Sequence, residues 1–158
     1  QTPAQTHHQA RPTTVSRFNH PARRAVLLVG LLCAATLARA GCSVPEHASP
    51  DIREVVVQHG GYEISKAKCE LLNRHNLRLA VTGEAAVLSD VSIGWATVRL
   101  ISNGNVVSSQ VQTSTYVNRF AGSSELAGEL LVRAINDAVA GLDFELAAQE
   151  VKRKMASR

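Results

Sequence analysis

The chain has 158 residues, a formal net charge of +4 and 45% hydrophobic residues. Its positive charge is confined to residues 1–40, which hold five arginines and no acid, whereas residues 41–158 hold twelve Lys or Arg against thirteen Asp or Glu. The larger part is therefore nearly neutral and has the size of one domain, and this balance excludes nucleic acid as an expected partner.

An uncharged apolar run of fourteen residues, Ala25 to Ala38, follows the pair Arg23-Arg24. The run is too short to cross a bilayer as a stable helix, and its basic flank and small-residue exit are typical of a bacterial export signal. An uncleaved membrane anchor and a buried helix are the alternatives. Residues 1–20 are poor in aliphatic side chains, so we predict a disordered preface plus export signal over residues 1–40. The domain is expected to fold outside the cytoplasm.

Two cysteines follow the apolar run, Cys42 and Cys69. The sequence Leu37-Ala38-Arg39-Ala40-Gly41-Cys42 resembles the lipobox of bacterial lipoproteins, which implies that Cys42 is diacylated and becomes the new N-terminus. Ser43 then resembles the residue that follows the cysteine in lipoproteins sorted to the outer membrane, facing the periplasm. Ala38-Arg39-Ala40 is also a site for ordinary signal peptidase, which would release a soluble periplasmic protein.

These two alternatives predict different chemistry at Cys42. Acylation makes Cys42 the lipidation site and leaves Cys69 unpaired. Ordinary cleavage allows a Cys42–Cys69 disulfide that closes a loop of about 28 residues, worth about 3 kcal/mol. Residues 41–52 include a Pro- and Ser-rich stretch, which predicts an extended spacer between a lipid and a folded body and favours the lipoprotein.

Residues 53–158 are predicted to form a single α+β domain. The β-branched stretch Arg53–Gln58 indicates a first strand, and Gly60-Gly61 a turn into Tyr62–Ile64. Ser65 is a candidate N-cap for a short helix that ends at Arg74.

Apolar residues alternate with small or polar ones from Leu77 to Val87, which is the pattern of a half-buried strand. Two further β-rich runs, Ile93–Ile101 and Val106–Val117, flank Asn103-Gly104. Since Asn and Gly tolerate positive φ, this pair predicts a two-residue type I′ hairpin turn.

The pattern becomes helical after Ser123, a candidate N-cap. The helix is predicted over 124–140, with Glu129 and Arg133 exposed. Its apolar stripe predicts four buried side chains: Leu126, Leu130, Leu131 and Ile135. Asp143 can cap a continuation that ends in the basic tract 152–154, where cations complement the helix dipole. The apolar side of this continuation holds Phe144, Ala147, Ala148, Val151 and Met155.

The fold class predicted from these elements is α+β: an antiparallel sheet of about four strands covered on one face by a long C-terminal helix, a two-layer sandwich. The signal with Cys42, the meander through Asn103-Gly104 and the helical ending 123–147 resemble small outer-membrane lipoproteins of the YajG type and auxiliary lipoproteins of ABC transport systems. The resemblance implies a non-enzymatic lipoprotein that acts as a binding or assembly module at the periplasmic face of a membrane. Its partners would be the membrane, through the lipid, and an envelope protein.

Residues with catalytic chemistry are few and scattered. A small periplasmic hydrolase that uses Cys69 or an unrecognised serine is the alternative function, with His59 or His75 lowering the pKa of the thiol. His47, His59 and His75 lack the i,i+3 or i,i+4 spacing that places two metal ligands on one helix face. No catalytic residue, metal site or cofactor is therefore predicted.

Overall fold

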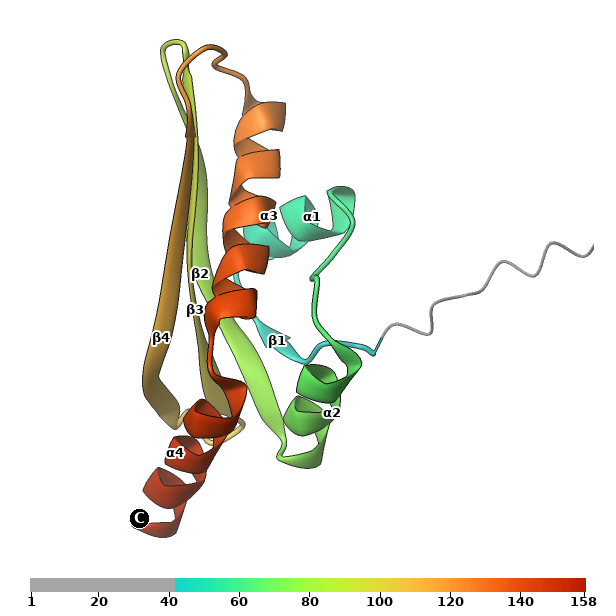
Figure 1. The fold of residues 1–158 in the computed structure, drawn as a ribbon, viewed down its shortest axis with the longest axis vertical. Coiled ribbons are helices and arrows are strands. Elements are labelled where there is room, and N and C mark those ends of the chain that lie inside the picture. The colour runs from blue at the N-terminus through green and yellow to red at the C-terminus, as the bar shows by residue number, and fades with distance from the viewer. Residues whose placement is uncertain (1–41) are drawn as a thin grey trace, which may run out of the picture. The chain divides into compact units, whose positions relative to one another are not determined.

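The computed structural model describes residues 42–158, and these form a four-stranded sheet with helices packed on one face (Figure 1). The elements in chain order are β1 (Glu46–His47), α1 (Pro50–Gln58), α2 (Lys66–Arg74), β2 (Leu77–Leu88), β3 (Val91–Ser102), β4 (Val107–Asn118), α3 (Ser124–Gly141) and α4 (Phe144–Ala156). The strand order is β1-β2-β3-β4, with β1 parallel to β2 and the other pairs antiparallel. The predicted α+β two-layer class is confirmed, although the parallel β1 makes the sheet mixed. The predicted preface and export signal lie outside the described residues.

The segment expected to be a spacer, 41–52, is part of the fold over its described residues. Glu46 of β1 pairs with Leu79 of β2, whose N–H donates to the Pro45 carbonyl at 2.8 Å. The Glu46 carboxylate also lies 3.2 Å from Arg53 Nε and accepts a hydrogen bond from the Tyr62 hydroxyl. These contacts join β1, α1 and the loop after α1, so the expectation of an extended spacer is wrong.

The strand predicted over 53–58 is also wrong, because these residues belong to α1. Ser49 is the N-cap and accepts from the Ile52 N–H, and Pro50 occupies the first turn, where its missing N–H costs nothing. Ile52 and Val56, four residues apart, are buried on one helix face. Capping and this spacing outweigh the weak β preference of the valines.

The predicted α2 is confirmed. The Ser65 hydroxyl accepts from the Lys68 N–H, as an N-cap does, and the helix ends at Arg74. Its Cys69 and Leu72 side chains are fully buried. Tyr62–Ile64 lies outside the sheet, so no hairpin forms there.

Three strands of twelve residues each, β2 to β4, form the body of the sheet. The β2–β3 register runs without a break from Leu77↔Ser102 to Leu88↔Val91. Alternate side chains such as Leu79 and Val98 point toward the helices and are fully buried. The predicted strands are confirmed to within two residues at each end.

The turn between β3 and β4 differs from the predicted type I′ turn. The Asn105 N–H donates to the Ser102 carbonyl, the Ser102 N–H donates to the Val106 carbonyl, and positive φ occurs at Asn105, at 59°. This is the three-residue hairpin in which a turn is followed by one left-handed residue. The Ser102 hydroxyl accepts from the Val106 N–H at 3.1 Å and so stabilises the longer loop.

Helix α3 covers the sheet as predicted, beginning after Ser123, whose hydroxyl accepts from the Leu126 N–H. Leu131 and Ile135 are buried, and Glu129 and Arg133 are exposed, as expected. Two predicted core leucines, Leu126 and Leu130, are only half-buried, because they flank the line of contact with the sheet.

Asp143 caps α4 by accepting from the Leu146 N–H, as predicted. The predicted apolar side of α4 is buried from Phe144 to Val151. Met155 is 48% exposed, because the last turn of α4 extends past the sheet (Figure 1). Among the helices formed by residues 42–158, none combines the length and the apolar character needed to span a membrane.

Candidate functional site: the open face of the sheet

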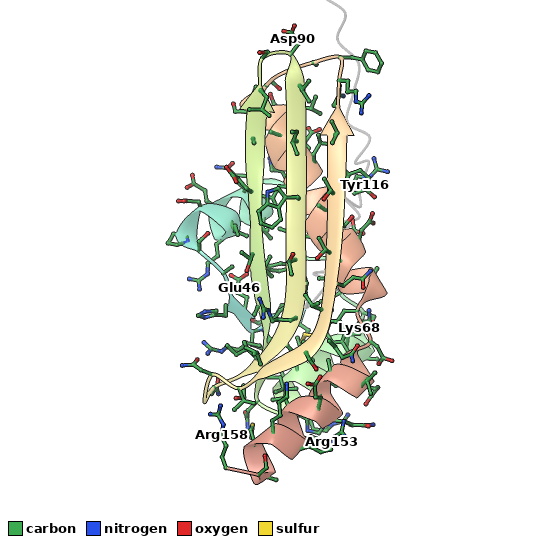
Figure 2. All side chains as sticks on the ribbon, turned by 90° about the vertical axis from the view of Figure 1, so that its left-hand side faces the viewer. Glu46, Lys68, Asp90, Tyr116, Arg153 and Arg158 are labelled. Carbon is green, nitrogen blue, oxygen red and sulfur yellow. A yellow bond between two sulfur atoms is a disulfide. The ribbon has the colours of Figure 1, made fainter. Side chains whose placement is uncertain are left out.

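The helices lie on one side of the sheet, and in residues 42–158 no helix covers the opposite side of β2, β3 and β4 (Figure 1, Figure 2). We call this side the open face. Its side chains follow from strand alternation and register. They are Arg78, Ala80, Thr82, Glu84, Ala86 and Leu88 of β2, Val91, Ile93, Trp95, Thr97, Arg99 and Ile101 of β3, and Val111, Thr113, Thr115 and Val117 of β4.

Trp95 lies at the middle of the open face, in register with Glu84 on one side and Thr115 on the other. Next to this row, the hydroxyls of Thr97 and Thr113 lie 3.0 Å apart and are hydrogen-bonded. The open face thus has an aromatic centre and ordered hydroxyls on adjacent strands.

Large aliphatic side chains lie farther along the open face. Leu88 is 61% exposed, and Val111 and Val117 are each about half exposed. Three charged residues belong to the open face: Arg78, Glu84 and Arg99. Exposed aliphatic side chains that share one face with a tryptophan indicate a candidate interaction site.

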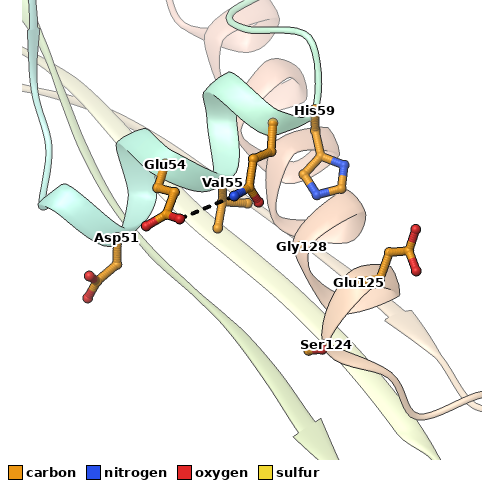
Figure 3. Close-up of a pocket in the computed structure, with 8 residues that line it drawn as sticks. Asp51, Glu54, Val55, His59, Ser124, Glu125 and Gly128 are labelled. Carbon is orange, nitrogen blue, oxygen red and sulfur yellow. Dashed lines mark hydrogen bonds between the residues drawn. The ribbon is translucent and has the colours of Figure 1, made fainter.

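The helix side of the sheet contains a hollow of about 560 Å³ between α1 and the start of α3 (Figure 3). Its lining includes three carboxylates, those of Asp51, Glu54 and Glu125, together with His59. The hydrogen bond drawn between its side chains joins Gln58 Nε2 to Glu54 Oε1 at 3.2 Å. Residues 42–158 contain no group of three or more His, Cys, Asp or Glu placed to hold a metal ion. This acidic hollow therefore offers neither a nucleophile–base contact nor a ligand set.

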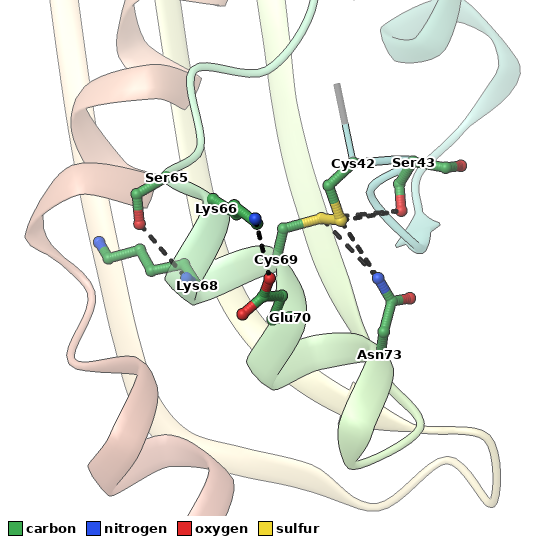
Figure 4. The surroundings of a disulfide bond; sticks show 8 residues. All are labelled: Cys42, Ser43, Ser65, Lys66, Lys68, Cys69, Glu70 and Asn73. Carbon is green, nitrogen blue, oxygen red and sulfur yellow. Dashed lines mark hydrogen bonds and ion pairs between the residues drawn. A yellow bond between two sulfur atoms is a disulfide. The ribbon is translucent and has the colours of Figure 1, made fainter. Parts of the chain in front are cut away.

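Cys42 and Cys69 are joined by a disulfide, with their Cα atoms 6.1 Å apart (Figure 4). Asn73, one helical turn after Cys69, donates from Nδ2 to the Cys42 sulfur at 3.1 Å. An acylated Cys42 would carry a thioether on the same sulfur, so lipidation and the disulfide exclude each other. Of the two alternatives that the sequence leaves open, the structure contains the disulfide.

The same bond removes the proposed cysteine nucleophile, since Cys69 is fully buried and has no free thiol. The three buried serines bond to backbone groups: Ser92 to Ala121 and Ser123, Ser102 to Val106, and Ser108 to Leu100 and Gln110. Their hydroxyls therefore serve the strand and loop connections.

The histidines predicted as candidate bases are separated from these groups. His75 Nε2 lies 3.1 Å from Lys152 Nζ at the far end of α2. Partial desolvation, followed by the Lys152 cation, lowers the pKa of His75. His59 lines the acidic hollow instead. The structure thus does not bring Cys69, a serine and a histidine together.

Sequence reasoning did not identify the open face, although its residues alternate with core residues along each strand. The sequence does carry a signal for this face in β3. Apolar residues occupy both sets of alternate positions there, because Ile93 and Trp95 lie between the residues that are buried against the helices.

Comparison of the chain with protein-family models and with curated proteins finds no match.

Proposed function

We propose that this domain is a non-catalytic, protein-binding or assembly module of the cell envelope, and that the open face is its docking surface. The observation that carries the proposal is the uncovered row around Trp95 on a sheet whose other face carries the helices. An exposed face that combines a tryptophan with aliphatic side chains and few charges is characteristic of the central part of protein interfaces.

The disulfide supports the part of this proposal that concerns location. Disulfides persist in oxidising compartments such as the bacterial periplasm and are rare in the cytosol. Together with the export signal expected before Gly41, the Cys42–Cys69 bond favours an exported periplasmic domain. Attachment to a membrane would then come from the bound partner, because the sulfur of Cys42 is occupied.

The partner expected from this chemistry is a protein that presents a predominantly apolar surface. Glu84 gives the open face one negative charge, and Arg78 and Arg99 give it two positive charges. Such charges orient a partner more than they strengthen its binding. The apolar residues around Trp95 would supply most of the affinity.

The test compares capture of envelope proteins by the wild-type domain and by two open-face variants that lie outside β4, Trp95→Asp and Leu88→Asp. The matched control is Ala140→Asp, which places the same charge on the exposed side of α3. A partner retained by the wild type and the control, and lost by both open-face variants, is the expected result. Circular dichroism confirms that each variant is folded. A partner that binds all four proteins equally would contradict the proposal.

A further inference from the structure

β4 is an edge strand of the sheet and carries no charged residue along its twelve positions, Val107–Asn118. Exposed edge strands in natural proteins are usually protected by lysines, prolines, bulges or a covering element, because their free N–H and C=O groups pair with other chains. Within residues 42–158, only one end of β4 has such protection.

Helix α4 covers one end of β4. The Glu150 carboxylate accepts from the Ser109 N–H at 2.9 Å and from the Gln110 N–H at 3.3 Å. Lys154 Nζ pairs with Glu150 and donates to the Val107 carbonyl at 3.2 Å. The outer edge is thus occupied over 107–110, whereas the described residues place no such cover along 111–118.

We propose that β4 pairs with β4 of a second copy of this chain, in antiparallel orientation over 111–117 and centred on Ser114. The two copies would be related by a two-fold axis, so each contributes the same surface. The sheet would then continue from one copy to the other without an exposed edge at β4.

The register centred on Ser114 makes the strand self-complementary. On the open face it places Val111 opposite Val117 of the second copy, and Thr113 opposite Thr115. Cross-strand pairs of β-branched residues and of threonines stabilise antiparallel sheets. Shifting the centre by one residue in either direction would lose the valine pairs and place Val111 opposite Thr115 or Arg119.

Charges beyond the paired segment also agree with this register. Arg119 follows the end of β4 at Asn118, and the same register would bring it toward Ser109 of the second copy, where the Glu150 carboxylate is bound. Hydrogen bonds from Lys154 and Ser109 lower the pKa of Glu150 to about 2, so this carboxylate is anionic at neutral pH. The contact of α4 with β4 therefore ends the paired segment and offers an opposite charge to the second copy.

The helix layer leaves room for this arrangement. α3 is centred on β3, with β2 and β4 on either side, and β3 of one copy would be three strand spacings from β3 of the other, about 14 Å. Packed helices need 8–10 Å between axes. The two α3 helices can therefore lie side by side without collision.

The test measures the molar mass of the oxidised domain by light scattering and the dissociation constant by analytical ultracentrifugation. The wild type is expected to be a dimer. The double variant T113K/T115K places lysines opposite lysines and should weaken dimerisation tenfold or more, as should T113E/T115E with glutamates. Mixing the two variants should restore a dimer, because each lysine then faces a glutamate. Trp95→Asp should remain dimeric, which separates this inference from the proposed function.

A cysteine at the centre tests the register directly. Ser114→Cys should form an intermolecular disulfide on oxidation, whereas Thr82→Cys on β2 should not. A monomeric wild type at high micromolar concentration would overturn the inference. A dimer that survives in both charged variants, or charged variants that do not pair when mixed, would also overturn it.

Discussion

Gly94 of β3 lies against the backbone of Leu131 in α3: a Cβ added at Gly94 would be 2.1 Å from the Leu131 nitrogen and 2.3 Å from the Leu130 carbonyl carbon. No side chain fits in that space, so the absence of one at Gly94 allows α3 to rest directly on the sheet. The buried apolar residues of α3 reach the core through this close approach.

Gly94→Ala is therefore expected to destabilise the domain by about 1–3 kcal/mol or more, because the methyl group must displace backbone and not a flexible side chain. Urea titration monitored by circular dichroism measures the loss. Gly104→Ala is the control, since a Cβ there meets only the Ser102 hydroxyl at 3.8 Å. Equal stability of the two variants would show that α3 does not approach β3 this closely.

The hairpin tip gives a second prediction, at Asn105. Its φ of 59° is tolerated by Asn and Gly but strained for a β-branched residue. Asn105→Val should lower the free energy of unfolding by about 1 kcal/mol or more, whereas Asn105→Gly should change it little. Thermal melts of both variants check this. Greater destabilisation by Gly104→Val than by Asn105→Val would instead indicate the type I′ turn.

The disulfide gives a third prediction. Protein recovered from the envelope should have an intact mass two hydrogens below the free-thiol mass, with no lipid added at Cys42. Adding a reductant should lower its stability by about 3 kcal/mol, the value expected for a loop of this length. The double variant Cys42→Ser/Cys69→Ser should not respond to reductant. A lipid mass on Cys42 with a free Cys69 thiol would establish the lipoprotein alternative.

Glu150 gives a prediction for the stability of the domain at low pH. Its folded pKa of about 2 lies below the ordinary 4.5, because Lys154 and Ser109 hydrogen-bond its carboxylate. The stability from this carboxylate is therefore fully present above pH 4.5 and is lost as the pH falls toward 2. The wild type should melt above Glu150→Gln at pH 7, and the difference should shrink at pH 3. A difference in melting temperature that does not depend on pH would mean that these contacts do not require the charge.

The sequence by itself determined the features that depend on neighbouring residues. The alternation from Leu77 to Val87 and the N-cap at Ser123 are local, because a strand or a first helical turn is selected by residues within a few positions. These elements predicted the two-layer class, and the structure contains them.

Tertiary structure alone decided the features that depend on distant residues. Arg53–Gln58 is helical because burial of Ile52 and Val56 adds to the local capping by Ser49, and together these outweigh the preference of valine for strands. The Cys42–Cys69 pairing required β1 to join the sheet and bring Cys42 to α2. The open face and the partly covered edge of β4 depend on where the helices pack on the sheet. No local pattern contains that information, because burial of one sheet face is settled by contacts between residues far apart in the chain.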